Sequence, residues 1–233
     1  MADLRHQQFS IMLLLAVDTS GKHGSIAIAR CAPDVSCEVI EVSPLARGTF
    51  SAELVPQIAT LLEKHGFSKA DIGALAVVSG PGSFTGLRIG LAVVKALADV
   101  LGKPIAAVSL LEALASKGQR GRVVSALDAG RSEVFLGEYE VGSKGTQLIR
   151  ERLLTRDEWL ASASEQLIVT ADHAIAEAAQ VKGLHVVEVE RPRSDVIVQL
   201  GWRKIVSGET VSPEALEANY IGRSEAELFV KGS

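Results

Sequence analysis

The sequence is poor in aromatic residues and carries no excess of positive charge. Phe, Trp and Tyr together make up 4% of the 233 residues, so the core is expected to consist of Leu, Val, Ile and Ala in closely packed helices and strands. The formal net charge is −4, which argues against a large basic surface that neutralises many phosphates. Any link to RNA is therefore predicted to be indirect.

Cysteine is scarce as well. Cys31 and Cys37 are too few for a disulfide framework. At six positions apart they could bridge a hairpin, but we expect two reduced thiols in or beside strands, because cytosolic proteins rarely keep disulfides. The apolar run at residues 11–17 is too short to span a bilayer, and no signal-peptide pattern accompanies it. We expect a cytoplasmic protein without membrane contact, in which residues 1–10 form an unstructured leader.

Residue groupings typical of catalytic and metal sites are missing too. No two of the five histidines stand three to five positions apart, which excludes a helical two-histidine metal site. No Ser-His-Asp or His-Cys grouping emerges from the motif-bearing segments. The Trp and Tyr residues are scattered, without the ladder of a single-strand RNA binder. The sequence therefore predicts no metal and no catalytic residues in this chain.

The order of the expected elements indicates an α/β protein. A continuous apolar run and two alternating segments predict an antiparallel meander of three strands. Helices and short apolar strands then alternate, which predicts a mixed five-stranded sheet. This is the arrangement of the lobes of actin, Hsp70 chaperones and sugar kinases (the ASKHA fold). The expected strands are 11–17, 25–30, 37–42, 74–79 and 105–108, and the helices are 51–65, 84–101 and 110–117.

The pattern starts again after a small polar linker at residues 118–121. We therefore expect two lobes, over residues 11–118 and 119–233, of which the second is a truncated copy of the first. Its expected strands are 122–128, 132–141, 147–152, 167–170 and 185–189, and its helices are 156–163, 171–180 and 194–207.

A glycine-rich turn lies between the strand at 74–79 and the helix at 84–101. Backbone N–H groups at such a place can receive an anion. The turn is no Walker A loop, because no Lys-Ser/Thr pair follows its last glycine, and it is not a dinucleotide fingerprint. An anion site and a purely structural turn remain alternatives. The nucleotide or anion candidates are Gly80, Gly82, Ser83, Thr85 and Gly86.

A second candidate site is the sequence Asp18-Thr19-Ser20 at the end of the first strand. Kinase-like ATPases place metal and phosphate ligands at such a strand-to-turn junction. Asp18 could equally be a turn-forming residue whose side chain accepts hydrogen bonds from the backbone.

The helix at 84–101 has apolar or small residues on nearly every face. A helix that is apolar all round is buried by more than its own sheet, and small residues let a second helix approach. This indicates either a helix-on-helix subunit interface or packing beneath the second lobe. Arg88 on the first turn opposes the helix dipole, so it either has a carboxylate partner from elsewhere or is a solvated arginine.

Four stretches in order resemble the TsaB (YeaZ) family. The most specific is Ala74-Leu75-Ala76-Val77-Val78-Ser79-Gly80-Pro81-Gly82-Ser83-Phe84-Thr85-Gly86-Leu87-Arg88-Ile89-Gly90, and the others are residues 15–20, 127–135 and 213–223. The resemblance covers nearly the whole chain after residue 11.

The resemblance implies a shortened, inactive relative of TsaD, the enzyme that transfers threonylcarbamoyl to adenosine 37 of tRNAs reading codons that begin with A. TsaD-like proteins hold a metal through an H-x-x-x-H pair, and Leu110 and Leu114 stand at the matching positions. Phe50 stands where many TsaB-like sequences have a histidine.

The resemblance also implies partners. It predicts a homodimer of the chain alone, a heterodimer with TsaD through the helices at 51–65 and 84–101, and recruitment of the ATPase TsaE. ATP or ADP could lie at the subunit interface. The interface candidates are Leu54, Ile58, Leu61, Arg88, Ala92, Lys95 and Ala96.

Two rival functions use the same fold. An active ATPase or kinase would need a second acidic-glycine loop at the start of the second lobe, for which Asp128-Ala129-Gly130 is the candidate. A metallopeptidase is disfavoured by the spacing of the histidines.

Overall fold

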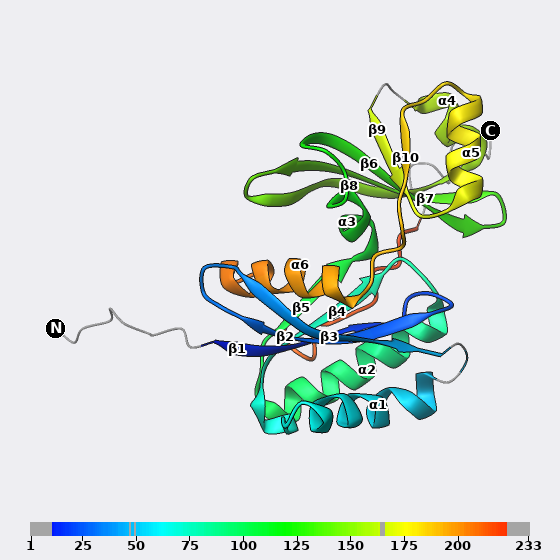
Figure 1. Cartoon of the computed structure of the whole chain (residues 1–233). Coiled ribbons are helices and arrows are strands. Elements are labelled where there is room, and N and C mark those ends of the chain that lie inside the picture. The colour runs from blue at the N-terminus through cyan, green and yellow to red at the C-terminus, as the bar shows by residue number, and fades with distance from the viewer. Residues whose placement is uncertain (1–10, 47, 49, 164–165, 223–233) are drawn as a thin grey trace. The chain divides into compact units, whose positions relative to one another are not determined.

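Two five-stranded sheets form the framework of the computed structural model (Figure 1). The structure describes residues 11–46, 48, 50–163 and 166–222. The expected leader at 1–10 and Arg223, the last residue of the TsaB-like stretches, lie outside the described residues.

The first sheet has the strand order β3-β2-β1-β4-β5. Its first three strands form the expected antiparallel meander, and β4 pairs with β1 in parallel. The central strands β1 and β4 are buried along nearly their whole length, as continuous apolar runs require. The strands are β1 (Met12–Asp18), β2 (Gly24–Cys31), β3 (Cys37–Leu45), β4 (Ile72–Gly80) and β5 (Ile105–Ser109).

Helices cover both faces of this sheet. In Figure 1, α1 (Phe50–Lys64) and α2 (Phe84–Leu101) lie on one side of it and α6 (Ser194–Ser207) on the other. A short 3-10 helix, η1 (Lys69–Asp71), connects α1 to β4. Gly66, with φ of 73°, follows α1 and Gly208, with φ of 79°, caps α6, in agreement with the left-handed geometry that glycine permits at helix ends.

The second sheet repeats the topology of the first. Its order, β8-β7-β6-β9-β10, is again a meander of three antiparallel strands followed by two parallel ones. The second half is therefore a copy of the first with as many strands, and its truncation lies in shorter helices and strands between the meander and the last helix. The elements are β6 (Gly121–Gly130), β7 (Glu133–Gly142), β8 (Gly145–Thr155), α4 (Arg156–Ser162), β9 (Leu167–Thr170), α5 (His173–Val181) and β10 (Val186–Glu188).

The last helix of each half packs on the sheet of the other half. After β5 the chain forms α3 (Leu110–Ala115), which contacts β6 and β7, and after β10 it forms α6, which contacts β1 and β2. Of the described residues, one compact unit thus holds those within 11–78, 85–107 and 193–216, and the other holds those within 79–84, 108–192 and 217–222. These units differ from the expected continuous lobes 11–118 and 119–233 because of this exchange of helices.

The two cysteines are joined, contrary to the expectation of reduced thiols. Cys31 ends β2 and Cys37 begins β3 directly opposite, with 4.1 Å between their Cα atoms, and a disulfide links them. The N–H of Ala32 donates to the carbonyl of Ser36 at 2.8 Å and closes the hairpin turn. The prediction of reduced thiols is wrong because the hairpin register brings both side chains together. That prediction was based on the rarity of disulfides in cytosolic proteins and took no account of strand register.

Close packing between α6 and β4 gives a direct test of this fold. A Cβ atom added at Gly201 would lie 2.4 Å from the Cβ of Ala76. We expect Gly201→Ala to lower the free energy of unfolding by about 1–3 kcal/mol, because overpacking outweighs the ~1 kcal/mol gain in helix propensity. Urea denaturation measures this change.

The matched control is Gly142→Ala at the end of β7, where an added Cβ meets nothing within 4 Å. We expect a change within about 0.5 kcal/mol there. Equal stability of the two variants would contradict the packing of α6 on β4.

Candidate functional site

The Asp18-Thr19-Ser20 sequence lies buried at the end of β1, with at most 2% of each residue exposed. Oδ1 of Asp18 accepts a hydrogen bond from the backbone N–H of Ser20 at 2.8 Å and one from the Ser20 hydroxyl at 2.6 Å. This is the turn-stabilising role of aspartate. Of the two interpretations, these contacts favour the turn-forming one.

Thr19 ties the same turn to the start of α2. Its hydroxyl donates to the carbonyl oxygen of Gly86 at 2.7 Å. One turn further along the helix, a Cβ atom at Gly90 would lie 2.3 Å from Oγ1 of Thr19. Gly86 and Gly90 therefore serve a close contact inside the first unit. The small residues of α2 are divided between this inner contact and the outer face.

The first residues of the glycine-rich turn have a structural role. The N–H of Asn219 donates to the carbonyl of Ser79 at 2.8 Å. Gly80 has φ of 141°, and a Cβ there would lie 2.7 Å from the carbonyl oxygen of Asn219, so glycine is needed for both conformation and space. The start of the turn is thus held against the segment that follows residue 216.

The rest of the turn lies at the surface. Gly82, Ser83 and Thr85 are exposed, whereas Gly86 is buried. The ring of Phe84 packs against that of Tyr220, with 5.5 Å between the centroids, although each residue is more than half exposed. The two rings thus connect the exposed turn to the segment that follows residue 216.

The interface candidates of α1 and α2 separate into two groups. Leu54, Ile58 and Leu61 are at most 4% exposed and belong to the core of the first unit. Their assignment to a partner surface is wrong, because the apolar stripe of an amphipathic helix faces its own sheet. In contrast, Arg88, Ala92 and Ala96 are exposed at intervals of four residues, and Lys95 is half-buried.

Small side chains also line the outside of α1. Its exposed residues include Ala52, Val55 and Ala59, and 58% of Val55 is accessible. Both helices lie on the same side of the first sheet (Figure 1). We call these outward positions the α1–α2 surface, and it comprises Ala52, Val55, Ala59, Arg88, Ala92 and Ala96.

A polar cluster in the second unit was missed by the sequence analysis. The buried phenol of Tyr139 donates to Oε1 of Glu151, and the hydroxyl of Ser109 donates to the same oxygen at 2.5 Å. The side-chain amide of Asn219 donates to Oε2 of Glu151 at 2.6 Å. Glu151 thereby holds the segment after residue 216 to the second sheet. No motif could have found it, because the four residues come from separate elements.

The positions linked to a metal by resemblance are apolar and buried. Leu110 and Leu114 on α3 are inaccessible to solvent. Phe50, at the start of α1, is also buried, and its ring approaches the backbone of Gly24. Across the described ranges, no group of three or more His, Cys, Asp or Glu side chains is arranged to hold a metal ion.

The loop required by the rival ATPase is engaged in local contacts. The N–H of Asp128 donates to Oδ2 of Asp172 at 2.8 Å, which links the end of β6 to the start of α5. The carboxylate of Asp128 lies 3.9 Å from the guanidinium of Arg156.

The helices in the described part of the chain include none that is both long and apolar enough to cross a membrane.

Comparison with known proteins identifies the relatives of this chain. Residues 42–210 match the family described as TsaD: tRNA N6-adenosine threonylcarbamoyltransferase. The chain is 28% identical to the tRNA threonylcarbamoyladenosine biosynthesis protein TsaB of Bacillus subtilis, over 95% of this chain and 91% of the relative. The TsaB protein of Escherichia coli K12 is also 28% identical, over 92% and 96% of the two chains.

Solved structures agree with the sequence relatives. The structure of YeaZ from Pseudomonas aeruginosa matches with a TM-score of 0.73 and 26% identity, over 91% of this chain and 100% of that one. The chain belongs to the TsaB (YeaZ) family. The predicted ASKHA-type α/β fold is confirmed by this match and by the two sheets of repeated topology. In this TsaB-family chain, similarity extends over both halves.

The Tyr139–Glu151 contact predicts a pH effect on stability. Burial raises the pKa of Tyr139, and the negative charge of Glu151 raises it further. The folded protein keeps this phenol protonated, whereas an unfolded tyrosine ionises near pH 10. The contribution to stability is therefore complete below about pH 10 and is lost as the pH rises above it.

Ultraviolet absorbance at the phenolate band tests this in the Tyr220→Phe variant, in which Tyr139 is the remaining tyrosine. We expect phenolate absorbance to appear only together with loss of the folded circular-dichroism signal. A phenolate signal near pH 10 from protein that is still folded would contradict the buried contact.

Proposed function

We propose that the chain is the TsaB-type subunit of the machinery that makes threonylcarbamoyladenosine in tRNA. In this role it supports TsaD, which transfers threonylcarbamoyl to adenosine 37, and it contributes no catalytic residue of its own. The observation that carries the proposal is similarity to curated TsaB proteins along nearly the full length of both chains. The negative net charge agrees with indirect contact to tRNA.

Two features of the chain support a non-catalytic role. The carboxylate of Asp18 is buried and accepts hydrogen bonds from Ser20. Leu110 and Leu114 stand where TsaD-like proteins have metal-binding histidines, and leucine carries no atom that can ligate a metal. A chain with these features contributes to the reaction through the surface it presents to a partner.

The α1–α2 surface is the proposed site of association. Ala52, Ala59, Ala92 and Ala96 leave room for a partner helix to approach closely, and Val55 adds apolar area. We propose that TsaD binds there and that the chain forms a homodimer through the same surface when it is alone. TsaE joins the assembly, and ATP or ADP binds at the interface of the complex, in the cytoplasm.

The substitution Ala92→Glu tests this assignment. Position 92 is exposed, so the variant should fold normally, but a bound partner would bury the larger, charged side chain, and its desolvation is costly even with Arg88 one turn away. We expect the affinity for TsaD to fall at least about tenfold, equivalent to ~1.4 kcal/mol. Pull-down and titration calorimetry with purified TsaD measure this loss.

Val206→Glu is the matched control. Val206 is an exposed apolar residue on α6, which lies on the other side of the first sheet (Figure 1). The control should bind TsaD like the unmodified chain. Retention of wild-type affinity by Ala92→Glu would show that the partner binds elsewhere, and equal loss in both variants would point to a general effect of added charge.

A further inference from the structure

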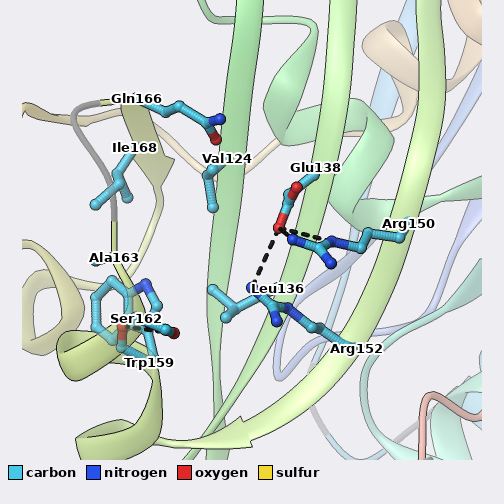
Figure 2. Close-up of a pocket in the computed structure, with 10 residues that line it drawn as sticks. All are labelled: Val124, Leu136, Glu138, Arg150, Arg152, Trp159, Ser162, Ala163, Gln166 and Ile168. Carbon is cyan, nitrogen blue, oxygen red and sulfur yellow. Dashed lines mark hydrogen bonds and ion pairs between the residues drawn. The ribbon is translucent and has the colours of Figure 1, made fainter.

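A pocket of about 210 Å³ opens on the second sheet, beside Trp159 of α4 (Figure 2). The register of β7 and β8 places Leu136 opposite Arg152 and Glu138 opposite Arg150. All four side chains line the pocket. Two cationic residues from one strand therefore lie beside one carboxylate from its neighbour.

The charged cluster contains two guanidinium groups and only one carboxylate. Both guanidinium groups approach the same oxygen, Oε1 of Glu138, at 2.7 Å from Arg150 and 3.1 Å from Arg152. The side chain of Glu138 is 15% exposed. Because one carboxylate faces two guanidinium groups, the charged residues described in the pocket carry a net charge of about +1 at neutral pH.

One donor of this cluster is unused. The Nε atom of Arg152 is buried, and it has no hydrogen-bond partner among the described residues. A buried donor without an acceptor is unfavourable, and most such groups in folded proteins are satisfied by protein, water or ligand. The planar fork of arginine matches the two oxygens of a carboxylate. The pocket thus offers donors in excess of the acceptor that Glu138 provides.

The other residues that line the pocket are mostly apolar, with Ser162 and Gln166 as the polar ones. Trp159 on α4, Ile168 on β9 and Val124 on β6 line the pocket, with the side chain of Gln166 at the rim in Figure 2. The volume is smaller than that of a typical drug-sized site. At ~30 Å³ of liquid volume per water molecule, it accommodates about seven waters or a ligand of roughly six to ten non-hydrogen atoms.

We propose that this pocket binds a small organic monocarboxylate. Its carboxylate contacts Arg150 and Arg152, and its short apolar body packs against Trp159 and Ile168. A single negative charge balances the net charge of the cluster, whereas a phosphate dianion would place a second charge close to Glu138, which disfavours it. The site is independent of the α1–α2 surface and of the proposed association with TsaD.

Benzoate is a suitable probe, with benzamide as its neutral counterpart and inorganic phosphate as the competing anion. The chain has two tryptophans, Trp159 and Trp202, so protein labelled with 15N at the indole gives two separate N–H signals. We expect benzoate at concentrations up to about 10 mM to shift the Trp159 signal in a saturable way. The Trp202 signal should stay in place, and benzamide and phosphate should have little effect.

Three variants test the roles of the charges. We expect Arg152→Gln to weaken benzoate binding about tenfold, because it removes one charged fork. Glu138→Gln should strengthen it about threefold or more, since it removes the competing carboxylate. Arg122→Gln, at an exposed position on β6 outside the pocket, removes the same charge and should bind like the unmodified chain.

The opposite responses of Arg152→Gln and Glu138→Gln separate a binding role from a structural one. If Arg152→Gln does not fold, Arg150→Gln carries the same expectation, because 57% of the Arg150 side chain is exposed. The proposal is overturned if benzoate leaves the Trp159 signal unchanged, if benzamide or phosphate shifts it equally, or if Glu138→Gln weakens binding as Arg152→Gln does.

Discussion

The contact between Thr19 and the first turns of α2 joins the end of β1 to the inner side of that helix. The Thr19 hydroxyl donates to the carbonyl of Gly86, and Gly90 leaves space for the same side chain. With α2 held in this rotation, Leu87, Leu91 and Val94 enter the core. Residues at the intermediate positions, Ala92 and Ala96, are left at the surface. The hydrogen bond from Thr19 and the absence of a side chain at Gly90 thus connect the end of β1 to the helix that carries the surface proposed for association.

The side chains at the end of β1 are engaged in contacts within the chain. Thr19 is committed to α2, and the carboxylate of Asp18 is held by Ser20 within the turn. At the glycine-rich turn, Gly80 is packed against Asn219, which Glu151 in turn holds by its side chain. Side chains at both places stabilise the chain itself, which is consistent with a protein that acts through its surface.

Much of the fold could be predicted from the sequence, because periodicity and breakers act locally. The helices were expected at 51–65 and 84–101 and span Phe50–Lys64 and Phe84–Leu101, and the prediction for Ser194–Ser207 is confirmed at both ends. The packing of α3 on the second sheet and of α6 on the first could not be predicted. Residues 118–121 resemble a linker, and a linker there indicates two continuous lobes, each with its own helices. Packing of a helix depends on contacts distant in sequence, which local patterns do not contain.

The candidate site was predicted less well, for a related reason. Apolar spacing marks Leu54, Ile58 and Leu61 as one face of a helix, but it does not tell whether that face meets the sheet or a partner. The structure shows that it meets the sheet. The Glu151 cluster and the Arg150–Arg152 pocket depend on strand register, which places Glu138 opposite Arg150. The joined pair Cys31 and Cys37 depends on register in the same way.

We propose that the chain contributes a binding surface and no catalytic group. The most direct measurement is threonylcarbamoylation of adenosine 37 in a reaction assembled from purified components, with this chain present, omitted, or supplied without TsaD. We expect efficient modification only when the chain and TsaD are both present, and no product or ATP turnover from the chain alone. Modification or ATP hydrolysis by the purified chain without TsaD would contradict this proposal.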